Sequence, residues 1–292
     1  LAVKIQYPGV AESISSDLAL VKPLAMRMFN LKGKDSEKYF KEVEGKLFEE
    51  TNYLMELRQS VEITQACRIL PHMEFPAYYP EWSGERILCM DWMEGQHLSE
   101  FTRGDFDPVL ANELGQALWD FYMFQMHGLR KVQADPHPGN FLVSKKGRLI
   151  AIDFGCVKAV PEEFYRPYFE LAQREHIEND AFFTEKLYEL EILTPGDSDA
   201  ERRFFKDLFR EMLSIFTAPF NEANFDFGDP VFWGRIAALS KQYAKNEQLR
   251  KMDAGRGSRH FLYINRTFFG LYNILHDLRA RVATQDFRRF IN

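Results

Sequence analysis

Three oxygen-bearing side chains lie close together near the middle of the chain: Asp135, Asn140 and Asp153. The first two belong to residues 134–140, ADPHPGN, where two prolines exclude a helix. Asp153 opens an Asp-Phe-Gly tripeptide. Hard divalent cations such as Mg²⁺ take carboxylate and amide oxygens as ligands, and phosphate and water complete the octahedron. These residue types therefore predict a magnesium site with Asn140 and Asp153 as metal ligands.

A β-hairpin is the element that must position these side chains. The apolar runs FLV (141–143) and LIAI (149–152) flank the turn SKKGR, which predicts two short antiparallel strands. Asn140 precedes the first strand and Asp153 follows the second, so the hairpin brings their ends together. Asp135 lies on the adjoining loop, at the same edge.

The spacing of these residues matches a known catalytic template. Four residues separate Asp135 from Asn140, and Asp-Phe-Gly follows thirteen residues after the Asn. In protein kinases the catalytic-loop Asp accepts the proton of the nucleophile, while the Asn and the Asp-Phe-Gly Asp hold Mg²⁺. We therefore predict ATP and Mg²⁺ as cofactors and Asp135 as a catalytic residue. The alternative is a proline-rich turn in which Asp135 and Asn140 cap backbone groups.

A lysine and a glutamate complete the predicted nucleotide site. Residues 1–8 read as a buried strand, and Lys4 stands where kinases place the lysine that contacts the α- and β-phosphates. On the following helix, Asn52, Glu56 and Gln59 have the spacing of one helix face. We predict that Glu56 forms an ion pair with Lys4 and that both are catalytic residues. Taken alone, a lysine near a chain start is normally solvated.

The segment that would contact adenine follows the next pair of strands. Residues 75–92 alternate in polarity about a Ser-Gly turn, which predicts a hairpin. Met90, Asp91 and Met93 end that hairpin and precede Gly95. Kinase hinges lie at this point, so we predict that Met90 closes the back of the pocket, that Met93 supplies the backbone contact, and that Asp91 belongs to the same nucleotide-binding segment. The alternative is an ordinary strand end.

Composition limits the class of protein. The 292 residues are 46% apolar and 27% charged, as in folded soluble proteins. A net charge of −6 argues against a nucleic-acid partner. Three widely spaced cysteines indicate neither a zinc site nor a disulfide framework, and they favour a reducing compartment. No apolar run approaches the ~18–20 residues that span a bilayer. The opening LAVKIQ reads as the middle of a strand, so we expect a fragment of a longer protein.

The order of elements predicts an α+β protein with a protein-kinase-like, bilobal fold. Residues 1–93 would form a truncated N-lobe of a small β-sheet plus helices, beginning at the lysine strand. Residues 94–292 would form a mainly α-helical C-lobe that carries the catalytic loop and Asp-Phe-Gly. An amphipathic helix is expected over 108–130, and helices follow from Pro161 almost to the end.

The segment after Asp-Phe-Gly is unusually short. Only residues 156–160 precede the expected helix start at Pro161, and no Ala-Pro-Glu follows. Protein kinases use a longer segment there to dock peptides, so its lack argues for a small-molecule or lipid-linked acceptor, or for ATP hydrolysis. Two rival functions remain open. One is a phosphotransferase of the aminoglycoside or choline kinase type, and the other is a catalytically silent nucleotide-binding scaffold.

Four segments together resemble the UbiB/AarF family of atypical kinases: LAVKIQYPGV, EETNYLMEL, ADPHPGN with IDFG, and NRTFFGLYNILHDLRA. The resemblance spans nearly the whole chain. It implies a kinase-like fold, nucleotide and Mg²⁺ binding, and ATPase or lipid-linked kinase activity that supports ubiquinone or other prenyl-lipid biosynthesis. It also implies quinone-biosynthesis enzymes as partners, peripheral membrane contact, and a cytoplasmic or organellar location in a mitochondrion or plastid.

Matching by position assigns the family's strand lysine to Lys4, its helix partner to Glu56, its catalytic Asp to Asp135 and its metal ligands to Asn140 and Asp153. Glu50 would be the first acid of the family's E-x-D element, whose second acid is here Asn52. Gln59 stands where Asn is usual, and Gln133 stands where many members have His. The family's K-x-G-Q motif and Ala-rich nucleotide loop would precede Leu1, so we expect this segment alone to bind nucleotide poorly.

Other conspicuous residues have simpler explanations. His137, between two prolines, is expected to shape or cap its loop, and Cys156 to be a small buried side chain. The aromatic stretch 204–233 is expected to form helical core, with a lipid-facing surface as the alternative. A basic tail is expected to be solvated; it comprises Arg279, Arg281, Arg288 and Arg289.

Overall fold

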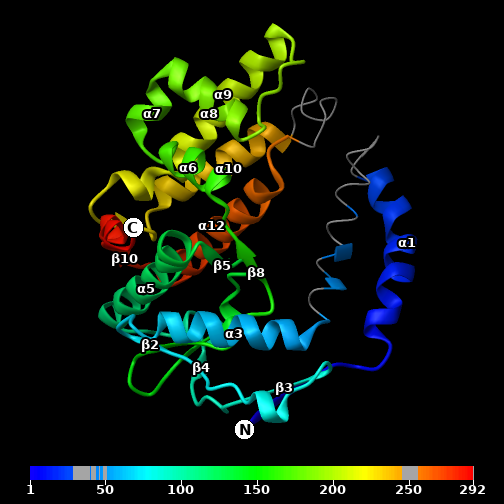
Figure 1. Ribbon diagram of the computed structural model, residues 1–292. Coiled ribbons are helices and arrows are strands. Elements are labelled where there is room, and N and C mark those ends of the chain that lie inside the picture. Colours follow the sequence, from blue (N-terminus) through cyan, green and yellow to red (C-terminus); the bar gives the residue numbers. More distant parts are fainter. Residues whose placement is uncertain (29–39, 41–43, 46, 49–50, 245–255, 292) are drawn as a thin grey trace.

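The computed structural model describes residues 1–28, 40, 44–45, 47–48, 51–244 and 256–291. Figure 1 shows the N-terminus, α3, β2, β3 and β4 at one end of the molecule, β5 and β8 in the middle, and α6 to α10 at the other end. The α+β expectation is confirmed. The predicted boundary between residues 93 and 94 stays a prediction. The acid that we matched to the E-x-D element, Glu50, lies outside the described residues.

The lysine strand is present, but it is not buried. β1 (Ala2–Ile5) pairs antiparallel with β3 (Ile87–Met90). Val3 is 50% exposed and Ile5 67% exposed, so the prediction of a buried strand is wrong. Within the described residues β1 pairs with β3 alone, and nothing described covers the face that carries these two side chains.

The hairpin expected over 75–92 forms in an irregular way. β2 (Met73–Glu74) pairs in parallel with β7 (Leu149–Ala151). The chain before β3 instead meets it through isolated antiparallel bridges, Tyr78 with Met90 and Gly84 with Ile87. The 3-10 turn η1 (Pro80–Trp82) replaces part of the expected first strand.

The hairpin that should position the site is confirmed. β6 (Phe141–Val143) pairs antiparallel with β7, with Phe141 opposite Ala151. These strands lie at the centre of a four-stranded sheet in the order β2, β7, β6, β4, in which β4 is Gln96–His97. All three residues of each central strand are buried, as their short, wholly apolar sequences require.

A second strand pair flanks the site and was not predicted. β5 (Lys131–Gln133) pairs antiparallel with β8 (Val157–Ala159), so residues 156–160 do not merely connect Asp-Phe-Gly to the next helix. The Ala134 amide donates to the Cys156 carbonyl at 2.7 Å, which continues this pairing up to the catalytic loop. Three-residue strands give little periodic signal, so their pairing depends on the tertiary fold.

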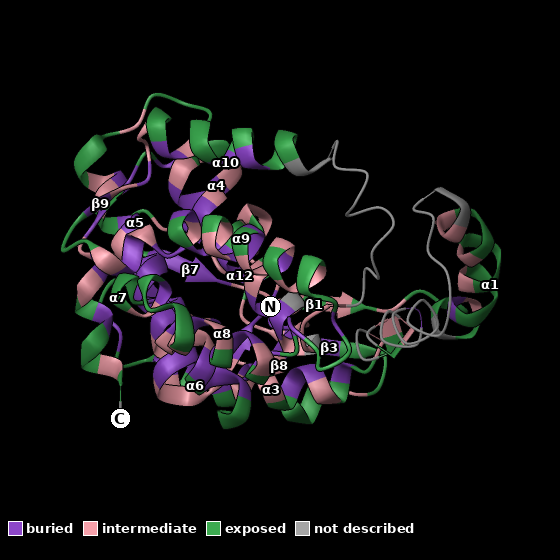
Figure 2. Cartoon of the chain, turned by 90° about the horizontal axis from the view of Figure 1, so that it is seen from above, coloured by how far each residue is buried: buried purple, intermediate pink, exposed green. Residues whose placement is uncertain are grey.

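Helix α5 is the centre of the C-terminal core. It spans Pro108–Met123, begins with Asp107 capping the Val109 amide, and continues as the π-helix η2 (Phe124–Leu129). Trp119 and Phe121 are fully buried, and α12 (Arg259–Asp277) packs against α5. Figure 2 shows buried residues in purple around α5 and β7. The other helices are α1 (Val10–Met28), α3 (Tyr53–Cys67), α4 (Leu98–Phe101), α6 (Glu162–Glu170), α7 (Arg174–Glu178), α8 (Asp180–Glu189), α9 (Asp199–Phe216) and α10 (Pro230–Ala244).

The aromatic stretch 204–233 contributes to this core. Four of its phenylalanines are buried and pack inside the molecule: Phe205, Phe209, Phe220 and Phe227. The 3-10 helix η4 (Ala218–Asn221) and the strand pair β9 (Phe225–Asp226) with β10 (Arg281–Val282) close its end. Among the helices described, none is both long enough and apolar enough to cross a bilayer.

The arginines of the basic tail are exposed, and two of them also form ion pairs. It ends in the 3-10 helix η5 (Thr284–Phe290). Arg281 pairs with Asp226 at 2.9 Å, and Arg289 pairs with the buried Asp120 at 2.6 Å. All four arginines are exposed, so the expectation of a solvated tail is confirmed, and the two ion pairs are made from the surface.

Candidate functional site

Lys4, Glu56 and Asp153 meet, although 52 and 149 residues separate the lysine from the two acids along the chain. The Lys4 ammonium lies 2.7 Å from Glu56 Oε1 and 3.4 Å from Asp153 Oδ2. Lys4 also lies over the Tyr53 ring, 5.3 Å from its centroid. Glu56 is only 5% exposed, whereas Lys4 and Asp153 are 34% and 39% exposed. The lysine thus joins a buried acid to one that faces solvent.

The electrostatics keep Lys4 charged. Burial by itself would lower the pKa of this ammonium, but attraction by Asp153 and then Glu56 outweighs it. The net pKa lies above the ordinary value of a lysine. At neutral pH the site therefore presents a fixed cation beside Asp153, as binding of phosphate requires.

The start of α3 places Glu56. Asn52 is the N-cap, and its side chain accepts a hydrogen bond from the Met55 amide at 3.0 Å. Asn52 therefore lies before the helix, exposed, and does not share a helical face with Glu56 as we predicted. Asn caps as well as Asp does, so its replacement of the expected acid leaves the helix start intact.

Asp153 is oriented by its own turn. Its Oδ1 accepts the Gly155 amide at 2.8 Å, while Oδ2 faces Lys4. Phe154 is fully buried and packs edge-on against Phe121 of α5 at 6.3 Å. The phenylalanine thus fixes the turn to the core, and the aspartate before it points outward.

The loop that carries Asp135 and Asn140, predicted to be the catalytic loop, is held through backbone carbonyls. The Ile152 amide donates to the Asn140 carbonyl at 3.0 Å, which joins the residue before Asp153 to the loop. The side-chain nitrogen Nδ2 of Asn140 donates to the backbone carbonyl of Asp135 at 2.9 Å. The side-chain nitrogen Nε2 of the buried Gln133 donates to the same oxygen at 2.9 Å. The Asn140 bond uses Nδ2 and not Oδ1. An amide oxygen and a carboxylate are ligand types that Mg²⁺ takes, so Asn140 Oδ1 and Asp153 suit this cation by their chemistry.

Two further loop residues behave nearly as expected. His137 Nδ1 accepts the Gly139 amide at 3.0 Å, so this histidine caps the 3-10 turn η3 (Pro138–Asn140). We predicted a buried side chain for Cys156, which directly precedes β8, but this side chain is only half-buried.

Behind Glu56 the site contains polar atoms without described partners. The hydroxyls of Ser60 and Tyr78 are buried and form no hydrogen bond that meets normal geometry. Burial raises the pKa of Tyr78, and repulsion from Asp153 and Glu56 raises it further. The nearby Ser60 hydroxyl lowers this pKa, but by less than burial raises it. Buried hydroxyls without partners are costly, so this position suits an ordered water or a polar group of a ligand.

The predicted adenine segment is only partly free to bind a base. The Asp91 carboxylate accepts the Tyr79 hydroxyl at 2.6 Å and the Ala77 amide at 3.0 Å, and these bonds, the Tyr79 bond first, lower its pKa. Its backbone amide donates to the Ala77 carbonyl at 2.9 Å. Asp91 therefore stabilises the segment that holds Met90 and Met93, both half-buried.

Arg266 is the site residue that sequence reasoning missed. Its guanidinium contacts Asp135 Oδ1 at 2.7 Å, across 131 residues. The segment NRTFFGLYN was recognised as a motif, but nothing in it indicated which residue would reach the loop. Gly270, one turn later, allows that approach: a Cβ there would lie 2.5 Å from Pro136 Cγ and 2.8 Å from its carbonyl oxygen.

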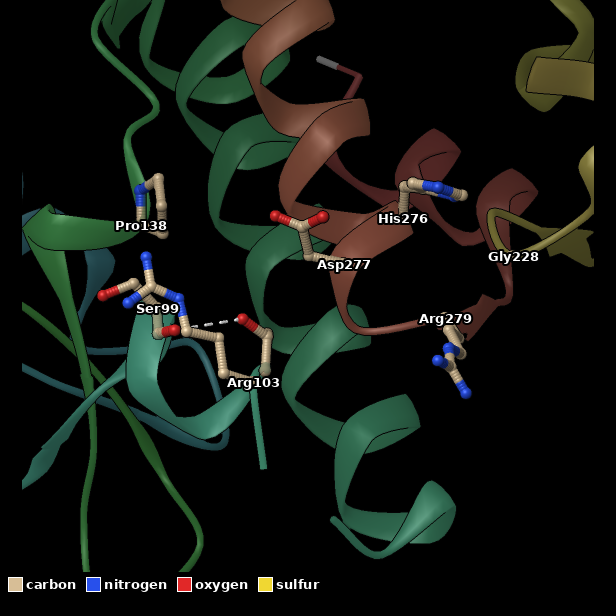
Figure 3. Close-up of a pocket in the computed structure, with 8 residues that line it drawn as sticks. Ser99, Arg103, Pro138, Gly228, His276, Asp277 and Arg279 are labelled. Atoms are coloured by element: carbon tan, nitrogen blue, oxygen red, sulfur yellow. Dashed lines mark hydrogen bonds between the residues drawn. The ribbon is translucent and has the colours of Figure 1, made fainter. Parts of the chain in front are cut away.

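A separate solvent-open cavity of about 450 Å³ lies beyond Pro138 (Figure 3). Ser99 and Arg103 line one side, and Asp277 and Arg279 at the end of α12 line the other. Lys4, Glu56, Asp135 and Asp153 do not line it, so it is distinct from the predicted nucleotide site.

Comparison with known proteins decides the family. A model of the ABC1 atypical kinase-like domain matches residues 1–185. The chain belongs to this family. It is 28% identical over 242 residues to "Atypical kinase COQ8B, mitochondrial" of Danio rerio, covering 82% of this chain and 38% of that protein. It is 27% identical over 241 residues to "Atypical kinase COQ8, mitochondrial" of Saccharomyces cerevisiae, covering 81% and 47%. The resemblance to UbiB/AarF proteins is confirmed.

The fold of this ABC1-family chain is also shared with a solved structure. Rv3197 of Mycobacterium tuberculosis, in complex with erythromycin, superposes with a TM-score of 0.68 at 20% identity, covering 98% of this chain and 70% of that one. The kinase-like fold is therefore confirmed. Since the chain spans less than half of the curated relatives named above, their full activities apply to it only as proposals.

Proposed function

We propose that this protein binds ATP with Mg²⁺ and acts as an atypical kinase or ATPase in ubiquinone or other prenyl-lipid metabolism. One observation carries the proposal: Lys4 lies between Glu56 and Asp153, at 2.7 and 3.4 Å. A charged lysine beside a metal-ligating carboxylate suits a nucleotide polyphosphate, and a buried acid holds that lysine in place. The family assignment supports the same chemistry.

Each residue has a defined part in this reaction. Lys4 would contact the α- and β-phosphates, and Glu56 would orient it. Asn140 Oδ1 and the Asp153 carboxylate would hold Mg²⁺, which when bound neutralises charge on the phosphates. The Asp135 carboxylate, 43% exposed, would accept the proton of the attacking water or hydroxyl.

The acceptor is proposed to be small, lipid-linked or water. Only residues 156–160 join Asp-Phe-Gly to α6, and three of them are taken up in the β5–β8 pair. α12 also packs on this loop, with Gly270 against Pro136 and Arg266 bonded to Asp135. Relatives named as mitochondrial and chloroplastic support an organellar site of action, with peripheral membrane contact and quinone-biosynthesis partners as part of the proposal.

The test is Asp153→Asn in the full-length protein. Mg²⁺-ATP should raise the melting temperature of the wild type and leave that of the variant unchanged, because the amide removes the ligand charge. Asp207→Asn, on the exposed side of α9, is the matched control and should respond as the wild type does. An equal Mg²⁺-dependent shift in the Asp153 variant would refute the proposed metal role.

A second candidate is a catalytically silent nucleotide-binding scaffold, favoured by the ion pair that engages Asp135 with Arg266. Turnover of ATP separates the two. An ATPase or kinase loses turnover on Asp135→Asn while keeping nucleotide affinity, whereas a scaffold shows the same negligible turnover before and after the substitution.

A further inference from the structure

Arg266 contacts the carboxylate that the proposed reaction needs free. The Arg266 side chain is 67% exposed and that of Asp135 is 43% exposed, and their atoms lie 2.7 Å apart. An ion pair this open contributes only about 0–1 kcal/mol to stability. Holding the fold together is therefore a weak explanation for the contact.

The backbone that carries Arg266 is fixed against the site at several points. Gly270 lies against Pro136, and the Tyr168 hydroxyl donates to Asn265 at 2.8 Å. The Tyr263 ring lies under the Lys158 ammonium of β8 at 4.8 Å from its centroid. The long, exposed side chain of Arg266 thus extends from a helix that is held against the site, as a positioned catalytic group requires.

The catalytic loop itself supplies no strong cation. Between Asp135 and Asn140 it contains only Pro, His, Pro and Gly. The His137 ring uses Nδ1 to cap Gly139, and Lys4 is already assigned to the α- and β-phosphates. Negative charge on the transferring phosphoryl group must be balanced for reaction, by metal and by arginine or lysine. Arg266 is the guanidinium that the described structure places at Asp135.

We propose that Arg266 is a catalytic arginine supplied from α12, which leaves Asp135 when Mg²⁺-ATP binds and contacts the γ-phosphoryl oxygens in the transition state. This inference rests on the proposed function. The oxygen of water or of a hydroxyl acceptor forms a bond to the γ-phosphorus, and the bond from that phosphorus to the β,γ-bridging oxygen breaks. Its electron pair remains on ADP. The proton of the nucleophile passes to the Asp135 carboxylate, which the departure of Arg266 has freed.

The experiment compares Arg266→Ala, Arg266→Lys and the matched control Arg281→Gln in the full-length protein. Arg281 also forms an exposed pair with an aspartate, but on β10. Arg266→Ala should lower kcat by about 10²–10³-fold while KM for ATP changes only a few-fold. Arg266→Lys should retain part of the rate, free guanidinium should restore part of the Arg266→Ala rate, and Arg281→Gln should match the wild type.

A binding measurement gives a second readout that does not need turnover. Aluminium fluoride with Mg²⁺-ADP mimics the transferring phosphoryl group, so it should tighten ADP binding to the wild type and to Arg281→Gln but not to Arg266→Ala. Turnover of Arg266→Ala within twofold of the wild type, a rate increase, or unchanged tightening by fluoride would each overturn the role of Arg266. A wild type that binds no Mg²⁺-ATP at all would instead overturn the proposed function.

Discussion

Adding one methyl group at Gly270 tests how α12 is placed against the catalytic loop. Gly270 lies in the middle of α12, where a glycine costs about 1 kcal/mol relative to alanine. Helix propensity alone therefore predicts that Gly270→Ala stabilises the protein.

The structure predicts the opposite sign. The new Cβ would meet Pro136 Cγ at 2.5 Å and the Pro136 carbonyl oxygen at 2.8 Å, and one of these atoms belongs to the backbone. Carbon atoms prefer about 3.5–4.0 Å, so the helix and the loop must separate by about 1 Å. Overpacking of this kind costs about 1–3 kcal/mol, and both contacts here are so short that we expect a cost above the gain in propensity.

Gly234 provides a matched control for this substitution. It also lies within a helix, α10, but a Cβ there would meet nothing within 4 Å. Gly234→Ala should therefore stabilise by up to about 1 kcal/mol. The difference between the two variants removes propensity and leaves the packing cost, so chemical denaturation should place Gly270→Ala about 1–3 kcal/mol below Gly234→Ala.

Gly270→Ala should also slow ATP turnover, because separation of α12 from Pro136 displaces Arg266 from Asp135. Equal stability of the two variants, together with wild-type turnover in Gly270→Ala, would show that α12 does not press on the loop. That result would refute the reasoning from close approach.

Two further predictions follow from ion pairs. Lys4→Met removes the cation at 2.7 Å from a carboxylate that is only 5% exposed. This substitution should lower the free energy of unfolding by about 1–3 kcal/mol, between the values for exposed and buried pairs. A double-mutant cycle with Glu56→Gln should show coupling, and strictly additive changes in the free energy of unfolding would contradict the pairing. Although burial opposes it, hydrogen bonding from Arg256 and from the side chain and amide of Thr194 lowers the pKa of Asp197 to about 2. A carboxyl group whose pKa is lowered on folding stabilises the folded state at pH values above its unfolded pKa, which is near 4. This stabilisation is lost as the pH falls from about 4 to 2. The wild type should lose about 2 kcal/mol over that window relative to Asp197→Asn, and parallel pH profiles would count against it.

Local patterns carried enough information to predict the central hairpin. FLV and LIAI are short apolar runs around a glycine turn, and their register follows from that turn. Asn140 and Asp153 flank the two strands, so strand pairing alone brings them to one edge. The Lys4–Glu56 contact was predicted from kinase-like spacing, and the distance between them came only from the fold.

Predictions from local sequence were wrong or missing where the structure depends on residues far away in the chain. β1 reads as buried because its residues are apolar, yet exposure depends on what covers it. Asn52 has the spacing of a helix face, but the helix begins after it. The β5–β8 pair is too short to give a periodic signal, and its two strands come from separate parts of the sequence.

The sequence by itself determined which residues meet in the proposed metal site, because Asp135, Asn140 and Asp153 are held by local turns and by one hairpin. Only the tertiary structure decided that α12 returns to the catalytic loop and brings Arg266 to Asp135. The physical reason is close packing: a glycine at position 270 allows two distant backbones to approach, and no pattern within either segment specifies that contact.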